Sequence, residues 1–136
     1  MKGLIPYIKF DGHCEEVLNY YQTVFGGEIA TLMPFKGAPM SLPAAWDKKV
    51  MHSEFRFGEC VFMACDAMPG DAPTEEGPIS MSLGTTNVNQ TEKWFTALAK
   101  EGVVTMPLQD TFWGAKFGIV KDKYGINWMF NCEQPK

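Results

Sequence analysis

Three polar residues at alternate positions of one segment have the types and the spacing needed for acid–base chemistry. His52, Glu54 and Arg56 alternate with apolar or small residues, so on a strand they would share one face. On that face His52 could act as a general base oriented by Glu54, and Arg56 could hold an anion. The alternative is a solvent-exposed ladder of cross-strand charges with no chemical role. The sequence leaves both interpretations open.

A tryptophan in a short loop is the next candidate. Trp113 is followed by Gly114 and leads into a segment that alternates like a strand. An aromatic side chain there could close over a ligand, or it could lie at a rim or a dimer interface. The cysteines offer less, because the four of them form no CxxC pair. They predict neither a zinc site nor a disulfide, and we expect no cofactor.

The spacing of apolar residues predicts the elements that must position these side chains. Helical spacing predicts two helices, over about 14–25 and 89–100, the second with Asn89 and Glu92 in the pattern of a capping box. Alternation and turn residues predict eight strands: 4–10, 28–33, 50–57, 60–66, 79–84, 103–108, 115–121 and 126–132.

The predicted order is βαβββ twice, so the chain is expected to contain an internal repeat. The helical segments superpose at an offset of 74 residues, which places Tyr20 on Trp94 and Tyr21 on Phe95. In the last strands the offset is 65, and the nine-residue difference matches a Pro-rich loop at 34–47 in the first half. We therefore expect modules at about 1–66 and 79–133, joined by a linker at about 67–78.

Composition limits the class of protein. The chain has 136 residues, 46% of them apolar and 21% charged, which is typical of one globular domain. The net charge is −4 and the basic residues are scattered, so no nucleic-acid partner is expected. Since no run approaches the roughly 18 apolar residues of a membrane span, and no secretory signal is recognisable, we expect a cytoplasmic protein with no membrane partner.

A set of short motifs, in this order along the chain, gives a resemblance to a known family. The chain resembles the vicinal-oxygen-chelate superfamily, which includes glyoxalase I, bleomycin-binding proteins and extradiol dioxygenases. Within that superfamily it is most similar to the PhnB-like group, also called 3-demethylubiquinone methyltransferase-like. The motifs are Tyr7–Gly12, Glu15–Glu16, Tyr20–Tyr21, Val24–Gly27, His52–Arg56, Phe112–Gly114, Val120–Gly125 and Asn127–Trp128.

The resemblance implies an α+β fold in which two curved mixed sheets enclose a cavity and carry their helices outside. It also implies a divalent metal held by the first and last strands of each module. By register those positions are Pro6, Ala64, Ser80 and Met129. Because a catalytic metal normally takes three ligands from His, Cys or carboxylates, we expect no metal here.

The methyltransferase label implies a nucleotide-containing methyl donor. On a Rossmann-type sheet such a donor would be expected at a glycine-rich turn between a strand and a helix. The only candidate pair, Gly26–Gly27, follows a helix instead. We therefore expect no methyl donor.

Strand parity, counted from the metal positions of the family, predicts which side chains line the cavity. Parity assigns Phe62, Asp66, Ser80, Asn127 and Met129 to a ligand, and the candidates above add Arg56 and Trp113 as ligand-binding residues and His52 and Glu54 as catalytic ones. We expect one domain over residues 1–136, a homodimer, that binds a small organic ligand without a metal. The alternative is an enzyme of the same superfamily, either metal-dependent or acid–base, that uses His52 and Glu54.

Overall fold

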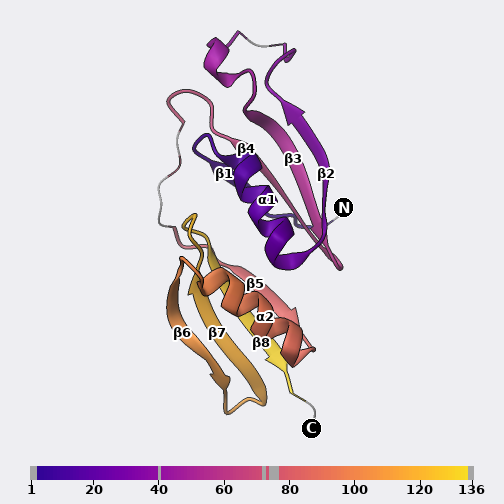
Figure 1. Cartoon of the computed structure of the whole chain (residues 1–136), viewed down its shortest axis with the longest axis vertical. Coiled ribbons are helices and arrows are strands. Elements are labelled where there is room, and N and C mark those ends of the chain that lie inside the picture. The colour runs from indigo at the N-terminus through magenta and orange to yellow at the C-terminus, as the bar shows by residue number, and fades with distance from the viewer. Residues whose placement is uncertain (1–2, 40, 72, 74–76, 135–136) are drawn as a thin grey trace. The chain divides into compact units, whose positions relative to one another are not determined.

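The computed structural model describes residues 3–39, 41–71, 73 and 77–134, and it divides the chain into two compact units. We call Met1–Thr74 the first module and Glu75–Lys136 the second module. Each module consists of one four-stranded mixed sheet with one α-helix on one of its faces (Figure 1). The predicted α+β class and the repeated βαβββ order are confirmed.

The first module forms its sheet in the order β1-β4-β3-β2, with β1 parallel to β4 and the other neighbours antiparallel. The helix α1 covers one face of this sheet, and we call the opposite face the open face of the first module (Figure 1). The elements are β1 (Tyr7–Phe10), α1 (Cys14–Phe25), β2 (Glu28–Pro34), the 3₁₀ helix η1 (Ala44–Trp46), β3 (Val50–Phe57) and β4 (Cys60–Asp66).

Aromatic rings form the core between α1 and its sheet. Tyr21 of α1 is fully buried, and its ring makes edge contacts with Phe55 of β3 and Phe62 of β4 at centroid distances of 6.5 and 5.8 Å. Phe25 stacks on Phe57 at 4.4 Å one turn further along the helix. Burying such rings contributes about 1.5–3 kcal/mol each, so this face of the sheet determines where the helix sits.

The second module repeats the strand order as β5-β8-β7-β6. Phe95 of its helix packs edge-on against Phe130 at 5.8 Å, and the opposite sheet face is the open face of the second module. The helix is capped by the side chain of Asn87, which accepts from the Gln90 N–H, two residues before the predicted Asn89. The elements are β5 (Met81–Thr85), α2 (Val88–Ala99), β6 (Val103–Asp110), β7 (Ala115–Lys121) and β8 (Asn127–Glu133).

The predicted loop after β2 is an insertion whose residues are described except at position 40. The Phe35 N–H donates to the Lys49 carbonyl at 3.0 Å, so the two ends of the insertion lie beside each other. Within it, Trp46 donates its indole N–H to the carbonyl of Ala67, and the Lys49 ammonium lies 4.7 Å from the Trp46 ring centroid. The linker predicted at 67–78 lies partly outside the described residues.

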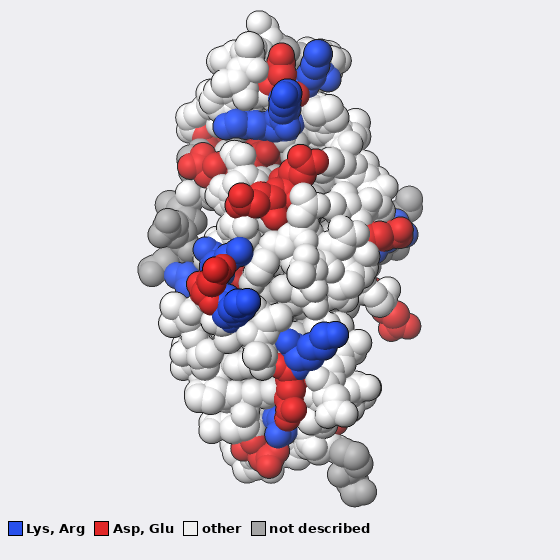
Figure 2. Space-filling view, viewed as in Figure 1, with Lys and Arg blue, Asp and Glu red and all other residues white. Residues whose placement is uncertain are grey.

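The surface of both modules carries charges of both signs. On the faces seen in Figure 2, Lys and Arg lie among Asp and Glu on each module. Lys116 and Lys123 of the second module pair with Glu92 and Glu101 at 3.5 and 3.2 Å. Neither helix in the described part of the chain has the length and apolar character that crossing a bilayer requires.

Candidate functional site

Strand β3 sorts its side chains between the two faces of the first module. Phe55 contacts Tyr21 of α1, and the Ser53 hydroxyl lies 3.8 Å from the Cys14 thiol at the start of the same helix. Because neighbouring strand residues point to opposite faces, His52, Glu54 and Arg56 lie on the open face. The structure therefore brings the three predicted polar residues together on the face away from the helix.

The hydrogen-bond partner of His52 is Tyr7 of β1. The Tyr7 hydroxyl lies 2.8 Å from His52 Nδ1, and the two rings stack with their centroids 5.7 Å apart. Tyr7 is absent from the predicted site, since it is 45 positions away and only the parallel pairing of β1 with β4 brings it to this face. Its place among the motifs of the resemblance was the one available signal.

A thiol extends this cluster. Cys65 of β4 lies on the same face as Tyr7, two residues beyond Met63, with which Tyr7 pairs. Burial, followed by the neighbouring Cys65, raises the pKa of Tyr7 to about 12, and burial also raises the pKa of the Cys65 thiol. Both groups are therefore protonated at neutral pH. We call Tyr7, His52 and Cys65 the tyrosine cluster.

Glu54 is engaged with Arg56 rather than with His52. The Arg56 Nε–H donates to Glu54 Oε2 at 2.6 Å. The Glu54 side chain is 17% exposed, whereas that of Arg56 is 58% exposed. The predicted orientation of His52 by Glu54 is thus replaced by orientation through Tyr7, while the Arg56 side chain remains largely exposed.

The predicted face of β4 is wrong by one residue. Phe62 is 2% exposed and packs against Tyr21 of α1, and Ala64 is paired with Ser53 on the same helix-covered face. Asp66 shares this parity, so Phe62 and Asp66 lie on the face opposite His52. A one-residue slip exchanges the faces of a whole strand. The predicted contact of Phe62 and Asp66 with a ligand on the open face has lost its basis.

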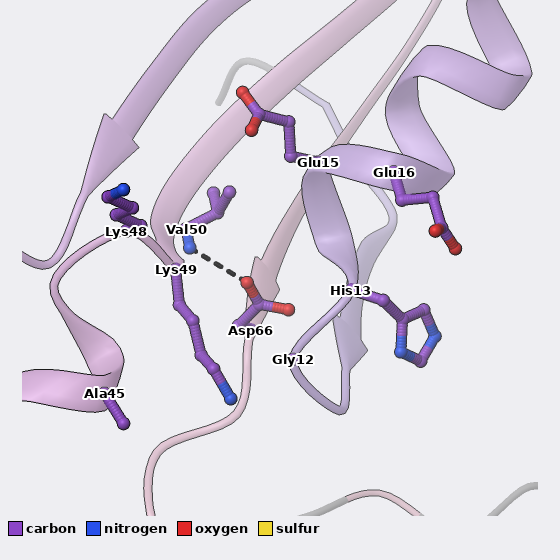
Figure 3. Close-up of a pocket in the computed structure, with 9 residues that line it drawn as sticks. All are labelled: Gly12, His13, Glu15, Glu16, Ala45, Lys48, Lys49, Val50 and Asp66. Atoms are coloured by element: carbon purple, nitrogen blue, oxygen red, sulfur yellow. Dashed lines mark hydrogen bonds between the residues drawn. The ribbon is translucent and has the colours of Figure 1, made fainter.

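Asp66 instead links the start of α1 to the start of β3 through hydrogen bonds. Its carboxylate accepts the Cys14 N–H at 2.8 Å and the Val50 N–H at 2.9 Å, and the residue is 3% exposed (Figure 3). It thereby satisfies a backbone donor at the first turn of α1 and another at the start of β3. The role of the Asp66 carboxylate is therefore structural.

A hollow of about 390 Å³ lies at this end of α1 (Figure 3). Its lining combines acidic and basic side chains around Asp66, so no single sign of charge dominates it. The lining residues are Gly12, His13, Glu15, Glu16, Ala45, Lys48, Lys49, Val50 and Asp66.

In the second module the predicted face of β8 agrees with the structure. Trp128 and Phe130 are buried on the side of α2, so the alternate residues Asn127, Met129 and Asn131 lie on the open face. Ser82 of β5 pairs with Met129. Ser80, two positions earlier and just before β5, is exposed.

Trp113 lies over this open face. Its indole N–H donates to the Asn131 side-chain oxygen at 3.1 Å, and its ring contacts Phe117, which pairs with Asn131 across the sheet, at 5.7 Å. The residue is nevertheless 52% exposed. A hydrogen bond and a ring contact thus hold an indole that still presents aromatic surface. The second module therefore places Trp113 on the same face as the predicted Asn127 and Met129.

The residues present do not fit the divalent metal that the superfamily implies. Among the described residues, no three His, Cys, Asp or Glu side chains converge as a possible metal site. Ala64, at one of the family's metal positions, is fully buried toward α1. Asp66 lies on the face opposite His52 and Glu54, so Asp66, His52 and Glu54 cannot bind one metal ion together.

The glycine pair also does not fit a phosphate-binding turn. Gly27 has a φ of +66°, and a Cβ atom on it would lie 2.3 Å from the Arg56 carbonyl oxygen. The glycine is therefore required for the close passage of the chain from α1 into β2.

Comparison with known proteins identifies the family of this chain. The sequence pattern of the 3-demethylubiquinone-9 3-methyltransferase family matches residues 2–130. The chain belongs to this family. It is 33% identical to protein YjdN of Escherichia coli over 97% of both chains. The crystal structure of protein PA1353 from Pseudomonas aeruginosa is similar with a TM-score of 0.88, at 37% identity, over 99% of this chain and 100% of that one.

More distant structures confirm the fold of the group. The PhnB protein of Bacillus cereus has a TM-score of 0.76 at 24% identity, over 96% of this chain and 99% of that one. A glyoxylase/bleomycin resistance protein/dioxygenase domain from Frankia has a TM-score of 0.65 at 12% identity, over 98% and 99%. The expected membership in the 3-demethylubiquinone methyltransferase-like group is confirmed by the family match, and these distant structures share the fold expected from the vicinal-oxygen-chelate resemblance.

Proposed function

We propose that this family member binds a small organic molecule through the open face of its second module. The observation that carries the proposal is Trp113, an indole held by Asn131 and Phe117 yet half exposed. Pockets for organic ligands combine aromatic surface with a few polar groups that fix orientation. Here Asn127 and Met129 of β8 share the face with the indole.

The hydrogen-bonding capacity of this face supports the same proposal. The Asn131 side-chain oxygen is occupied by the Trp113 N–H, which leaves the Asn131 amide N–H groups for a ligand. Asn127 offers both a donor and an acceptor, and Ser82 offers a hydroxyl. A molecule with a flat apolar part and polar edges would match these groups.

A thermal-shift screen of a small-molecule library, followed by titration of the compounds that stabilise the protein, tests the proposal. A ligand that binds only the native state must raise its apparent stability. We expect Trp113→Ala to weaken binding about tenfold or more, the equivalent of about 1.4 kcal/mol. The matched control is Trp46→Phe, which removes the indole bound to Ala67 in the other module and should leave affinity unchanged. Equal affinity in Trp113→Ala would contradict the proposal.

An enzyme that uses His52 as a proton donor is the second candidate, and the bond between Tyr7 and His52 supports it. An imidazole whose ring is fixed by a hydrogen bond and a stacking contact has the rigidity that proton transfer requires. In such a site Arg56, paired with Glu54, would bind an anionic group of the substrate. The same screen distinguishes the candidates, because an enzyme converts the compound that stabilises it and a binding protein returns it unchanged.

We also propose that the protein works as a homodimer in the cytoplasm. All four cysteines are free thiols, which suits a reducing compartment. The edge strand β6 exposes apolar side chains, among them Val103 at 63% and Val104 at 42%. An exposed apolar edge is a surface that a second chain can cover.

A further inference from the structure

The tyrosine cluster of the first module remains unused by the proposed binding face. Within the described chain, the hydrogen bond to Tyr7 is the only one that His52 makes, so Nδ1 is engaged and Nε2 is open. A neutral imidazole carries one proton, and its ring nitrogens therefore play different roles. The chemistry of this face depends on which nitrogen holds that proton.

The partners of Tyr7 determine the direction of the hydrogen bonds. A phenol O–H is a strong donor and an unprotonated imidazole nitrogen is a strong acceptor, whereas a thiol is weak in both roles. The best arrangement therefore has the Tyr7 O–H donating to His52 Nδ1. This arrangement requires the Tyr7 hydroxyl proton to be present, and the raised pKa of Tyr7 keeps it in place.

In that arrangement the proton of neutral His52 is on Nε2. If the ring becomes an imidazolium, both nitrogens carry protons and Nε2 still does. The open nitrogen is thus a donor in both charge states. It cannot accept a proton unless the bond to Tyr7 is reversed, so the base role predicted for His52 is disfavoured by its partner.

We propose that Tyr7 fixes His52 as an N–H donor on the open face of the first module, and that this face binds an organic ligand through a carbonyl or similar oxygen acceptor. Met33 pairs with His52 on β2, and Met63 pairs with Tyr7. The donor therefore has polarisable thioether side chains beside it, which can pack against the apolar part of such a ligand. The ligand class rests on the proposed small-molecule function, whereas the state of His52 does not.

Nitrogen-15 NMR of the imidazole rings tests the first half directly, because the chain contains only two histidines. At about pH 8.5 an ordinary imidazole is neutral, and the nitrogen shifts distinguish the protonated from the unprotonated position. We expect His52 to carry its proton on Nε2. His13 is an internal control of the opposite kind, since its Nδ1 lies 3.2 Å from the Asp11 carbonyl, which can only accept. His13→Gln assigns the signals.

Two variants separate the role of Tyr7 from general effects on the fold. Tyr7→Phe keeps the stacked ring and removes the hydroxyl, so the two His52 nitrogen signals should move toward each other as the tautomers mix. Tyr124→Phe removes a hydroxyl from the second module and should leave the His52 signals in place. A proton on His52 Nδ1 in the unmodified protein, or an unchanged spectrum in Tyr7→Phe, would overturn the proposal.

Acetophenone and ethylbenzene test the ligand class, because they share a phenyl ring and differ in the carbonyl. Acetophenone should shift the His52 Nε2 signal, and it should do so at least threefold less in Tyr7→Phe at the same concentration. Ethylbenzene should leave that signal in place. No response to acetophenone would refute the acceptor-binding half even with the tautomer as expected. If no library compound binds in a way that depends on Trp113, the proposed function is refuted and the assignment of the His52 proton is unaffected.

Discussion

At the scale of single residues, two buried carboxylates accept hydrogen bonds from residues of neighbouring segments. Asp66 accepts backbone N–H groups from Cys14 and Val50, and Asp122 accepts the Trp128 indole N–H at 2.9 Å. Both residues are 3% exposed. Hydrogen bonds to a charged group are worth about 1.5–3 kcal/mol, and an unsatisfied buried donor costs a similar amount.

Asp66→Asn should therefore lower the free energy of unfolding by about 2–3 kcal/mol, because the amide turns an N–H group toward one of the two backbone donors. Urea unfolding at neutral pH measures the loss. Asp71→Asn is the matched control: its carboxylate pairs with Lys9 at 2.6 Å on the surface and should contribute less than about 1 kcal/mol. Equal losses in both variants would show that Asp66 is not the junction described above.

The same scale shows what the sequence could reveal about His52. Its place on a polar face followed from alternation with Ser53 and Phe55, and the structure agrees. Its partner did not follow, because Glu54 is near in sequence whereas Tyr7 becomes a neighbour only through the pairing of β1 with β4. Long-range pairing is not encoded in local spacing.

At the scale of elements, the connection from α1 to β2 is the tightest passage in the first module. Gly27 at φ +66° has no space for a Cβ atom against the Arg56 carbonyl, whereas Gly58 at φ +54° has nothing within 4 Å of that position. The two glycines share a left-handed backbone and differ in their surroundings.

Alanine at the two positions should therefore have different effects. Gly58→Ala should cost about 1–2 kcal/mol from backbone strain alone, and Gly27→Ala should cost about 3 kcal/mol or more because the clash is added. Thermal or urea unfolding of both variants gives the comparison. A Gly27→Ala protein as stable as Gly58→Ala would contradict the close packing of this turn.

Strand faces were predictable where polar and apolar residues alternate, as in β3 and β8, and were not predictable in β4. In β8 the buried Trp128 and Phe130 alternate with Asn127 and Met129, so polarity marks the faces. In β4 the residues before Asp66 are apolar or small on both faces, and only the offset of 65 residues assigned those faces. That offset pairs Met63 of the open face with helix-facing Trp128, so it is wrong by an odd number of residues.

At the scale of the whole molecule, the duplicated strand order was predictable because periodicity and turn residues mark each element, even though β1 begins at Tyr7 and not at Leu4. Ligand contacts were less predictable, because they require the face of each strand to be known as well as its position.

The exposure of the edge strand β6 is also a property of the whole molecule. Val103, Val104 and Met106 are 63, 42 and 39% exposed on an edge strand.

A solution mass of about twice the 15.2 kDa chain is therefore expected by light scattering. Val103→Lys should shift the protein toward the mass of one chain, because a charge on an edge strand opposes pairing with another chain. Ile79→Lys is the control, since Ile79 is 82% exposed but lies outside the strands, and it should keep the mass of two chains. A single-chain mass for the unmodified protein would refute the dimer.

The insertion between β2 and β3 leaves and rejoins the sheet at the hydrogen-bonded neighbours Phe35 and Lys49. Because its ends are already together, the strands do not depend on the length of the chain between them. Closing a longer loop costs little, about 0.6 kcal/mol for each doubling of its length. This point in the first module can therefore accept foreign peptide segments, such as an affinity tag or a reporter, with the strand pairing kept intact.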